Sequence, residues 1–317
     1  MQNDSRVVVV GSSGIIGQRL CEFFAARNIP VIGICRGLTG SQKLHRLSYP
    51  ILEVGDFTKF FNWRELLGDS DLVLFVGDSS SYSSLERLTG LMSESRQIGL
   101  ASSVIRRLVS ACQQFDGARF VYFSSANLYD QGQDGLKSSI NEDAELLIQG
   151  LYAQVKHACE EALMCTMNEE KRSSMILRLP IVYGAGGNNA MTRLFKFARS
   201  PMILPAILVN DRPISTLCIN NLVDAVWHIY KKKKMMKTVY HIADSEPLNL
   251  IQIWRLLKGF QNDVGEQKES IACRFKTIKV GRFLDDSRFR NDYDWHPKIK
   301  ASEGILSVFH GPQTLYD

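Results

Sequence analysis

The chain begins with a run of apolar residues that is followed by regularly spaced glycines. Four consecutive valines, residues 7–10, form the pattern of a strand that is buried on both faces. Gly11, Gly14 and Gly17 follow directly, and apolar residues then recur at helical spacing from Leu20 onward. A strand, a glycine turn and a helix in this order present backbone N–H groups and a helix N-terminus to a phosphate group. The pattern therefore predicts a dinucleotide site, with an ordinary strand-to-helix turn as the alternative.

Buried strands and amphipathic helices continue to alternate up to about residue 180. Strands that alternate with helices are joined by right-handed crossovers and form a parallel, doubly wound sheet. We therefore predict an α/β fold of the Rossmann type, which binds ligands beyond the carboxyl ends of its strands. The predicted strands cover residues 6–10, 31–35, 51–54, 72–76, 119–123 and 175–179, and the predicted helices cover 60–67 and 98–114.

The alternation breaks at a glycine- and asparagine-rich segment, residues 184–189. Beyond it, the spacing of apolar residues predicts helices over residues 191–199 and 216–230. Residues 239–243 are strand-like and can return to the sheet.

This change of pattern divides the chain into two predicted domains. Residues 1–180 are expected to form the Rossmann domain that binds NAD(P). Residues 181–317 are expected to form a smaller, mainly substrate-binding domain, of which about residues 214–245 return to pack on the first. Trp254 and Trp295 are predicted to anchor the core of this second part.

The composition fits a protein with a large buried core. A chain of 317 residues that is 45% hydrophobic has enough apolar surface to bury. Its 38 basic and 33 acidic residues give a net charge of +5, which is too small to favour nucleic acid and is compatible with an anionic small molecule. The lysines at 231–234 suit the solvated C-terminus of a helix. The seven cysteines form no Cys-x-x-Cys motif, and no apolar run approaches about 18 residues. We expect a cytoplasmic protein with reduced thiols and no membrane partner.

Three further residues form a candidate catalytic set. Tyr152 and Lys156 are four positions apart, so they share one face of a helix. A nearby ammonium stabilises a phenolate, which makes Tyr152 a usable acid and base. Ser125, at the end of a predicted strand, can orient a carbonyl or hydroxyl oxygen beside it. A Tyr-x-x-x-Lys pair is also common on helix surfaces, so the pair alone does not define a site.

Together, the glycine turn, the paired serines at a strand end and the Tyr-x-x-x-Lys pair resemble the extended short-chain dehydrogenase/reductase family. This is the group of NAD(P)-dependent nucleotide-sugar epimerases, dehydratases and reductases, and the resemblance extends essentially from end to end. The motifs that carry it are Gly11-x-x-Gly14-x-x-Gly17, Gly55-Asp56, the strand 120–129 with Ser125, Tyr152 with Lys156, residues 177–184 and residues 219–225.

The resemblance implies roles for these residues. Ser125 would hydrogen-bond the reacting oxygen, Tyr152 would exchange the hydroxyl proton, and Lys156 would hold the nicotinamide ribose while hydride transfer takes place at a sugar carbon. No metal is implied, and the family expectation is a homodimer. The residues expected to bind the cofactor are Gly11, Ser13, Gly14, Ile15, Ile16, Gly17, Arg36, Asp56, Phe57, Gly77, Tyr152, Lys156 and Pro180.

The nucleotide-sugar substrate is expected to contact the second part of the chain. Asn188 and Asn189 are candidates for its diphosphate, with a glycine–asparagine turn that holds no ligand as the alternative. Arg193 and Arg212 are candidate phosphate partners, and Asn127 lies two residues after Ser125.

The end of the second strand indicates which dinucleotide is bound. NAD enzymes usually carry Asp or Glu there, which bonds the ribose 2′-hydroxyl and repels a 2′-phosphate. In this chain the strand is followed by Arg36, whose guanidinium suits a phosphate and can stack on adenine. We therefore expect NADP(H) rather than NAD(H), with Ser12 or Ser13 as helpers. If Arg36 only stacks on adenine, NAD fits as well.

The chain departs from the family pattern in two places, and only the second departure narrows the expected reaction. Gly77-Asp78 stands where the family has small alanines, and the polar loop 79–84 follows it. No acidic pair follows Ser125, which argues against dehydration. A phosphorylated cofactor favours reduction of a 4-keto group on a nucleotide-linked hexose. The alternatives are an NAD-dependent nucleotide-sugar 4-epimerase and, from another class, a catalytically idle module that senses NADPH.

Overall fold

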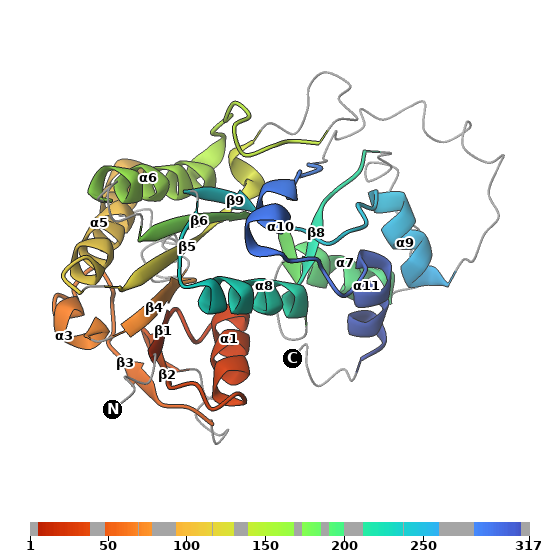
Figure 1. Ribbon diagram of the computed structural model, residues 1–317. Coiled ribbons are helices and arrows are strands. Elements are labelled where there is room, and N and C mark those ends of the chain that lie inside the picture. The colour runs from red at the N-terminus through yellow and green to blue at the C-terminus, as the bar shows by residue number, and fades with distance from the viewer. Residues whose placement is uncertain are drawn as a thin grey trace. The chain divides into compact units, whose positions relative to one another are not determined.

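The computed structural model of the chain contains two compact units (Figure 1). Each unit is assembled from three separate segments of the chain. The first unit consists of Met1–Leu128, Leu147–Arg178 and Ile229–Tyr240, and the second consists of Tyr129–Leu146, Leu179–His228 and His241–Asp317. The residues that the structure describes are 6–38, 48–68, 70–77, 93–115, 117–129, 139–167, 173–184, 190–199, 212–236, 238–259 and 282–311.

A seven-stranded sheet with the order β3-β2-β1-β4-β5-β6-β9 is built on the first unit. Strand β1 runs parallel to β2 and β4, and the pairs β2–β3 and β4–β5 are parallel as well. The order 3-2-1-4-5-6 is that of a Rossmann fold, so the predicted fold class is confirmed. The strands are β1 (Arg6–Val10), β2 (Val31–Cys35), β3 (Ile51–Glu53), β4 (Ser70–Phe75), β5 (Arg119–Ser125), β6 (Ser174–Leu179) and β9 (Val239–His241).

The four valines of β1 lie at the centre of this sheet. None of residues 7–10 is exposed to solvent. Val8 is in register with Ile32 of β2 and with Val73 of β4, so β1 has a hydrogen-bonded neighbour on each side. A strand with two neighbours and two covered faces is what a continuous apolar run predicts.

Helices α5 and α6 lie side by side against the sheet (Figure 1). Ile105 and Leu108 of α5, Leu163 of α6 and Phe120 of β5 belong to one buried core. Burial of each such side chain contributes about 1.5–3 kcal/mol relative to exposure. The helices of the first unit are α1 (Ile15–Ala25), α3 (Trp63–Leu67), α5 (Glu94–Cys112), the 3-10 turn η1 (Ala126–Leu128) and α6 (Gly150–Thr166).

The second unit contains a parallel pair of short strands, β7 (Ile181–Tyr183) and β8 (Thr216–Cys218). The helix predicted over residues 216–230 is therefore wrong in its first three residues, because they pair with β7 and the helix begins only at Ile219. A strand of three residues is too short to show a period of its own. The remaining helices are α7 (Ala190–Ala198), α8 (Ile219–Lys232), α9 (Leu250–Lys258), α10 (Ser287–Tyr293) and α11 (Ala301–His310).

Aromatic side chains fill the core of the second unit. Tyr183, Phe195 and Trp254 belong to one buried cluster, and Trp295 is buried as well, so both predicted tryptophan anchors are confirmed. The lysines at 231–234 are exposed, as expected for the end of a helix. Within the ranges that the structure describes, no helix is both long enough and apolar enough to cross a membrane.

Candidate active site

The turn after β1 requires glycine at position 11. Gly11 has a φ of +98°, a conformation that residues with a side chain rarely adopt. A Cβ atom at Gly11 would lie only 2.6 Å from the backbone N of Gly77, at the end of β4. The amides of Gly11 and Ser12 both donate to the carbonyl O of Ile34, at 2.8 and 3.1 Å. The turn is therefore held between the carboxyl ends of β2 and β4.

Gly17 allows helix α1 to pack directly on this turn. A Cβ atom at Gly17 would lie 2.3 Å from the carbonyl O of Gly11 and 2.7 Å from the Cα of Ser12. Gly14 differs, because it is exposed and the nearest atom to its Cβ position is 3.5 Å away. The glycines at 11 and 17 thus close the turn, whereas the backbone at Gly14 stays open to a ligand.

The open side of the turn fits an anionic group such as the diphosphate of a dinucleotide. Ile15 and Ile16 are the first residues of α1, and amides in the first turn of a helix have no acceptor within that helix. The helix N-terminus also carries a partial positive charge. Ser13 is half-buried in the turn itself.

Arg36 lies exposed immediately beyond β2, as the sequence predicts. Glu53, the last residue of β3, is in register with Cys35, and its Oε2 accepts the Leu38 N–H at 3.2 Å. A guanidinium and a carboxylate therefore share this edge of the sheet. Glu53 was not among the predicted residues, although its position at the end of the strand beside β2 was available as a signal.

Asp56 shapes the loop after β3. Its Oδ1 accepts both the N–H and the hydroxyl of Thr58 at 2.8 Å, which forms a tight Asx turn. Phe57 packs its ring against the edge of Trp63. Gly77 is buried, and a Cβ atom there would lie 2.9 Å from the ring of Phe75. Asp78 and residues 79–84 lie outside the described residues.

Tyr152 and Lys156 occupy one face of α6 in the first unit, and Ser125 ends β5 in the same unit. The Lys156 Nζ is buried and donates to the carbonyl O of Phe123 at 2.9 Å. It lies 5.9 Å from the centroid of the Tyr152 ring. The Tyr152 side chain is exposed, whereas Ser125 is buried and its Oγ accepts the Asn127 N–H at 3.1 Å. The structure thus places an ammonium beside an accessible phenol.

A buried ion pair holds α6 to β6. Arg178 donates to the carboxylate of Glu160 with three N···O distances of 2.7, 3.1 and 3.2 Å, and Glu160 is completely buried. Glu160 lies one helical turn after Lys156, so this pair fixes the helix that carries the candidate catalytic residues. Glu160 was not among the predicted residues, and its four-residue spacing from Lys156 was its local signal.

The remaining candidates lie in other parts of the structure. Asn127 is exposed on η1. Pro180, Arg193 and Arg212 belong to the second unit, where Arg193 is exposed on α7 and the other two are half-buried. Asn188 and Asn189 lie outside the described residues. The substrate roles of these residues stay predictions.

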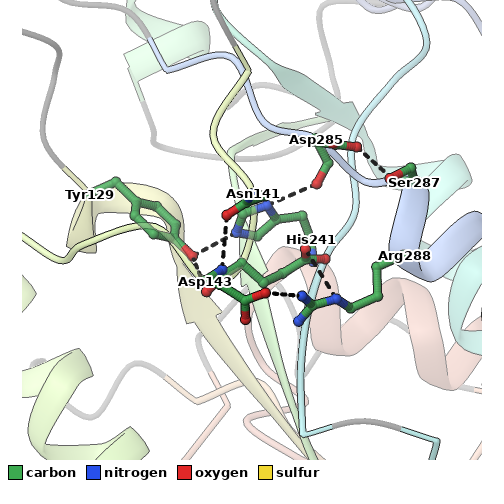
Figure 2. A network of polar contacts seen from close by, with 8 residues as sticks. Tyr129, Asn141, Asp143, His241, Asp285, Ser287 and Arg288 are labelled. Carbon is green, nitrogen blue, oxygen red and sulfur yellow. Dashed lines mark hydrogen bonds and ion pairs between the residues drawn. The ribbon is translucent and has the colours of Figure 1, made fainter.

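The second unit contains a buried polar network centred on His241 (Figure 2). The hydroxyl of Tyr129 lies 2.8 Å from His241 Nε2, and His241 Nδ1 lies 3.0 Å from the carbonyl O of Asp285. The Glu142 carboxylate accepts the His241 N–H at 3.0 Å and forms an ion pair with Arg288 at 3.5 Å. Burial raises the pKa of the Glu142 carboxyl, whereas hydrogen bonds from Ser287 lower the pKa of Asp285. No local pattern in the sequence indicates this network.

A Rossmann sheet with a glycine turn and a serine, tyrosine and lysine at these positions is the arrangement of the extended short-chain dehydrogenases and reductases. The family model for the NAD-dependent epimerase/dehydratase family matches residues 7–243, so the chain belongs to that family. The protein is accordingly an enzyme of an NAD-dependent epimerase/dehydratase family. Among curated proteins, none matches the chain in sequence.

Several solved structures resemble the chain over nearly its whole length. The UDP-glucuronic acid 4-epimerase from Bacillus cereus in complex with NAD is 18% identical, with a TM-score of 0.74 over 98% of this chain and 100% of that one. The UDP-N-acetylglucosamine 4-epimerase from Bacillus cereus is 16% identical, with a TM-score of 0.72 over 96% and 98%. The NAD-dependent NDP-hexosamine 5,6-dehydratase TunA of tunicamycin biosynthesis is 18% identical, with a TM-score of 0.74 over 96% of each chain. At this level of identity the likeness shows a shared fold.

Proposed function

We propose that the protein is a nucleotide-sugar 4-epimerase that transfers hydride reversibly at C4 of the sugar. The observation that carries the proposal is the buried ammonium of Lys156, held on the Phe123 carbonyl beside the exposed phenol of Tyr152. This pair provides an acid and base that a ligand can reach. The likeness in fold to the two UDP-sugar 4-epimerases supports C4 as the reacting position.

Each residue of the proposed site has its own role in the reaction. Tyr152 takes the proton from the sugar hydroxyl and returns it, and Ser125 donates a hydrogen bond to the same oxygen. The Lys156 Nζ lies beside the Tyr152 ring and would hold the nicotinamide ribose of a bound cofactor. The nicotinamide cofactor, when bound, supplies the hydride acceptor and donor. The backbone from Gly11 to Gly17 would hold its diphosphate.

A 4-keto-hexose reductase that uses NADPH is the second candidate, and Arg36 favours it. An arginine just beyond β2 attracts a 2′-phosphate. The Glu53 carboxylate on the neighbouring strand repels one, which favours NAD. The dissociation constants of NADP and NAD for the wild-type protein therefore test this candidate, and equal or tighter binding of NAD would contradict the preference for NADP.

Turnover assays separate the candidate functions. The protein is incubated with a panel of UDP-sugars, among them UDP-glucuronic acid, UDP-glucose and UDP-N-acetylglucosamine, and with 4-keto nucleotide sugars, each with NAD(H) and NADP(H). An epimerase interconverts the C4 epimers without net consumption of cofactor, whereas a reductase oxidises NADPH in proportion to product. Cofactor binding without turnover on any member of the panel would support an idle sensor and overturn the proposal.

Replacement of Tyr152 by phenylalanine tests the assigned acid and base. Tyr152→Phe is expected to lower kcat by about 10²–10⁴-fold, the contribution of a positioned acid or base, while the dissociation constant of the cofactor is kept. Tyr230→Phe is the matched control, because it removes one tyrosine hydroxyl from the same unit at α8. Wild-type turnover in Tyr152→Phe would refute the assignment.

A further inference from the structure

Three passages of the chain between the two units meet at Tyr129. The chain passes from one unit to the other at residues 128/129, 146/147, 178/179, 228/229 and 240/241. Tyr129 forms an isolated antiparallel bridge with Leu146, and the Leu147 amide donates to the carbonyl O of Leu128 at 2.8 Å. The Tyr129 hydroxyl lies 2.8 Å from Nε2 of His241. The first passage is therefore hydrogen-bonded to the second and, through the Tyr129 side chain, to the fifth.

The bond between Tyr129 and His241 is buried and directional. Tyr129 is 1% exposed and His241 is completely buried. Because the Asp285 carbonyl can only accept, the Nδ1 atom of His241 carries the hydrogen of the 3.0 Å bond between them. In the neutral ring, Nε2 then accepts from the Tyr129 hydroxyl. The two rings also meet edge to face, with centroids 5.2 Å apart.

Both partners are fixed by further contacts. The Arg282 Nε donates to the carbonyl O of Tyr129 at 3.1 Å. The His241 N–H donates to Glu142, which is itself paired with Arg288, and Figure 2 shows this network around the histidine. The Tyr129 hydroxyl also lies 3.4 Å from the carbonyl O of Glu142, so its removal takes away a buried hydrogen-bonding group, which costs about 1–3 kcal/mol.

The first and second passages are adjacent in sequence to the candidate catalytic residues. Ser125 precedes Tyr129 by one turn of η1, and Tyr152 follows Leu147 at the start of α6. The bond from the Leu147 amide to Leu128 joins the end of the first segment to the beginning of the second. The register between these two segments therefore sets the distance between the serine and the tyrosine.

We infer that Tyr129 and His241 are positioning residues that fix the placement of Ser125 relative to Tyr152. The inference rests on the proposed function, because it assigns the hydrogen bond a part in turnover. Neither residue needs to touch the substrate. Their bond fixes Tyr129, whose backbone pairs with Leu146 at the start of the segment that carries Tyr152. Misplacement of catalytic groups by about 1 Å can lower a rate by about 10²-fold.

The test measures turnover and cofactor affinity in three variants. Tyr129→Phe keeps the ring and removes the hydroxyl, and it is expected to lower kcat about tenfold while the KM for substrate and the Kd of the cofactor change less than about twofold. His241→Gln is expected to have a similar effect. The double variant is expected to be no worse than the more impaired single variant, because both changes remove one interaction.

A matched control separates positioning from loss of stability. Ser302→Ala removes a hydroxyl that donates to Glu246 at 2.6 Å in the same unit and is not one of the contacts around Tyr129 and His241. It is expected to lower the unfolding temperature as Tyr129→Phe does and to keep the wild-type kcat. Wild-type kcat in Tyr129→Phe, or an equal loss of kcat in Ser302→Ala, would overturn the inference.

Hydrogen exchange tests the inference independently of activity. In Tyr129→Phe, amides in the peptides that cover residues 125–129 and 147–152 are expected to exchange faster than in the wild type, and those peptides are expected to be unaffected in Ser302→Ala. Unchanged exchange in both peptides would refute the positioning role. A wild-type protein that turns over no nucleotide sugar but shows this exchange pattern would refute only the proposed function.

Discussion

At the scale of single residues, Gly17 shows how a missing side chain determines the packing of a ligand turn. A Cβ atom there would overlap backbone atoms of Gly11 and Ser12, which cannot rotate away. We expect Gly17→Ala to lower the free energy of unfolding by about 1–3 kcal/mol, as overpacking does. The Kd of NAD(H) is expected to rise at least about tenfold, because α1 must move from the turn. Urea unfolding and a cofactor titration measure the two effects.

Gly99 is the matched control for this substitution. It lies inside α5, and no atom is within 4 Å of its Cβ position. Gly99→Ala is expected to raise the free energy of unfolding by up to about 1 kcal/mol through helix propensity and to leave cofactor affinity unchanged. Equal stability of the two variants would contradict the steric account of Gly17.

Asp244 is a buried carboxylate that is surrounded by donors. It accepts hydrogen bonds from the Cys218 N–H at 3.0 Å, from Asn221 at 2.7 Å and from the Tyr183 hydroxyl at 2.9 Å. Burial nevertheless raises the pKa of Asp244 above its usual value. The folded protein therefore binds a proton at this site more readily than the unfolded chain does.

This raised pKa predicts a pH dependence with a definite sign. The stability that Asp244 contributes through proton binding is complete below about pH 4 and is lost as the pH rises through the folded pKa. An asparagine at position 244 does not titrate, and its NH2 group would face hydrogen-bond donors. The free energy of unfolding of Asp244→Asn is therefore expected to be lower than that of the wild type by about 1–3 kcal/mol. The stability difference between wild type and variant is expected to shrink as the pH rises from about 4 to 7. A difference that grows with pH, measured by urea unfolding, would contradict this account.

At the scale of elements, the Arg178–Glu160 pair determines how firmly α6 is held to the sheet. Glu160→Gln removes the negative partner of the buried Arg178 guanidinium. We expect a loss of about 3–5 kcal/mol in the free energy of unfolding, measured by chemical denaturation. The activity of the remaining folded protein should fall as well, because α6 carries Tyr152 and Lys156.

The neighbouring residue on the same helix provides the control. Glu161 is 58% exposed and lies 3.7 Å from His157, so the contact is on the surface. Glu161→Gln is expected to change stability by less than about 1 kcal/mol. If both glutamine variants lose the same stability, the buried pair does not hold the helix.

The elements differ in how far the sequence could predict them. The strands of the Rossmann sheet were predictable because burial on both faces leaves continuous apolar runs, and the convergence of Tyr152 and Lys156 follows from helical spacing alone. Strand β8 was not predictable, because its three residues become a strand only through pairing with β7. The Tyr129–His241 bond joins two segments that are distant in sequence, so no local pattern indicates it.

At the scale of the whole molecule, the first unit depends on a segment that comes late in the chain. The buried guanidinium of Arg119 donates to the carbonyl O of Ile229 at 2.7 Å and to that of Tyr230 at 3.3 Å. These carbonyls belong to the last turn of α8, where a cation is favourable. Strand β9 also comes from this late segment and pairs beside β6.

The late segment has a consequence for synthesis on the ribosome. Strand β6 is complete at Leu179, but its outer neighbour β9 is made only when residue 239 is reached. Until then β6 is an apolar edge strand that can pair with another chain. The Ile229 and Tyr230 carbonyls that accept from Arg119 are also made only after β6 is complete. The nascent chain therefore passes through a period of aggregation risk while the intervening residues emerge, and a chaperone that shields this edge would act at that stage.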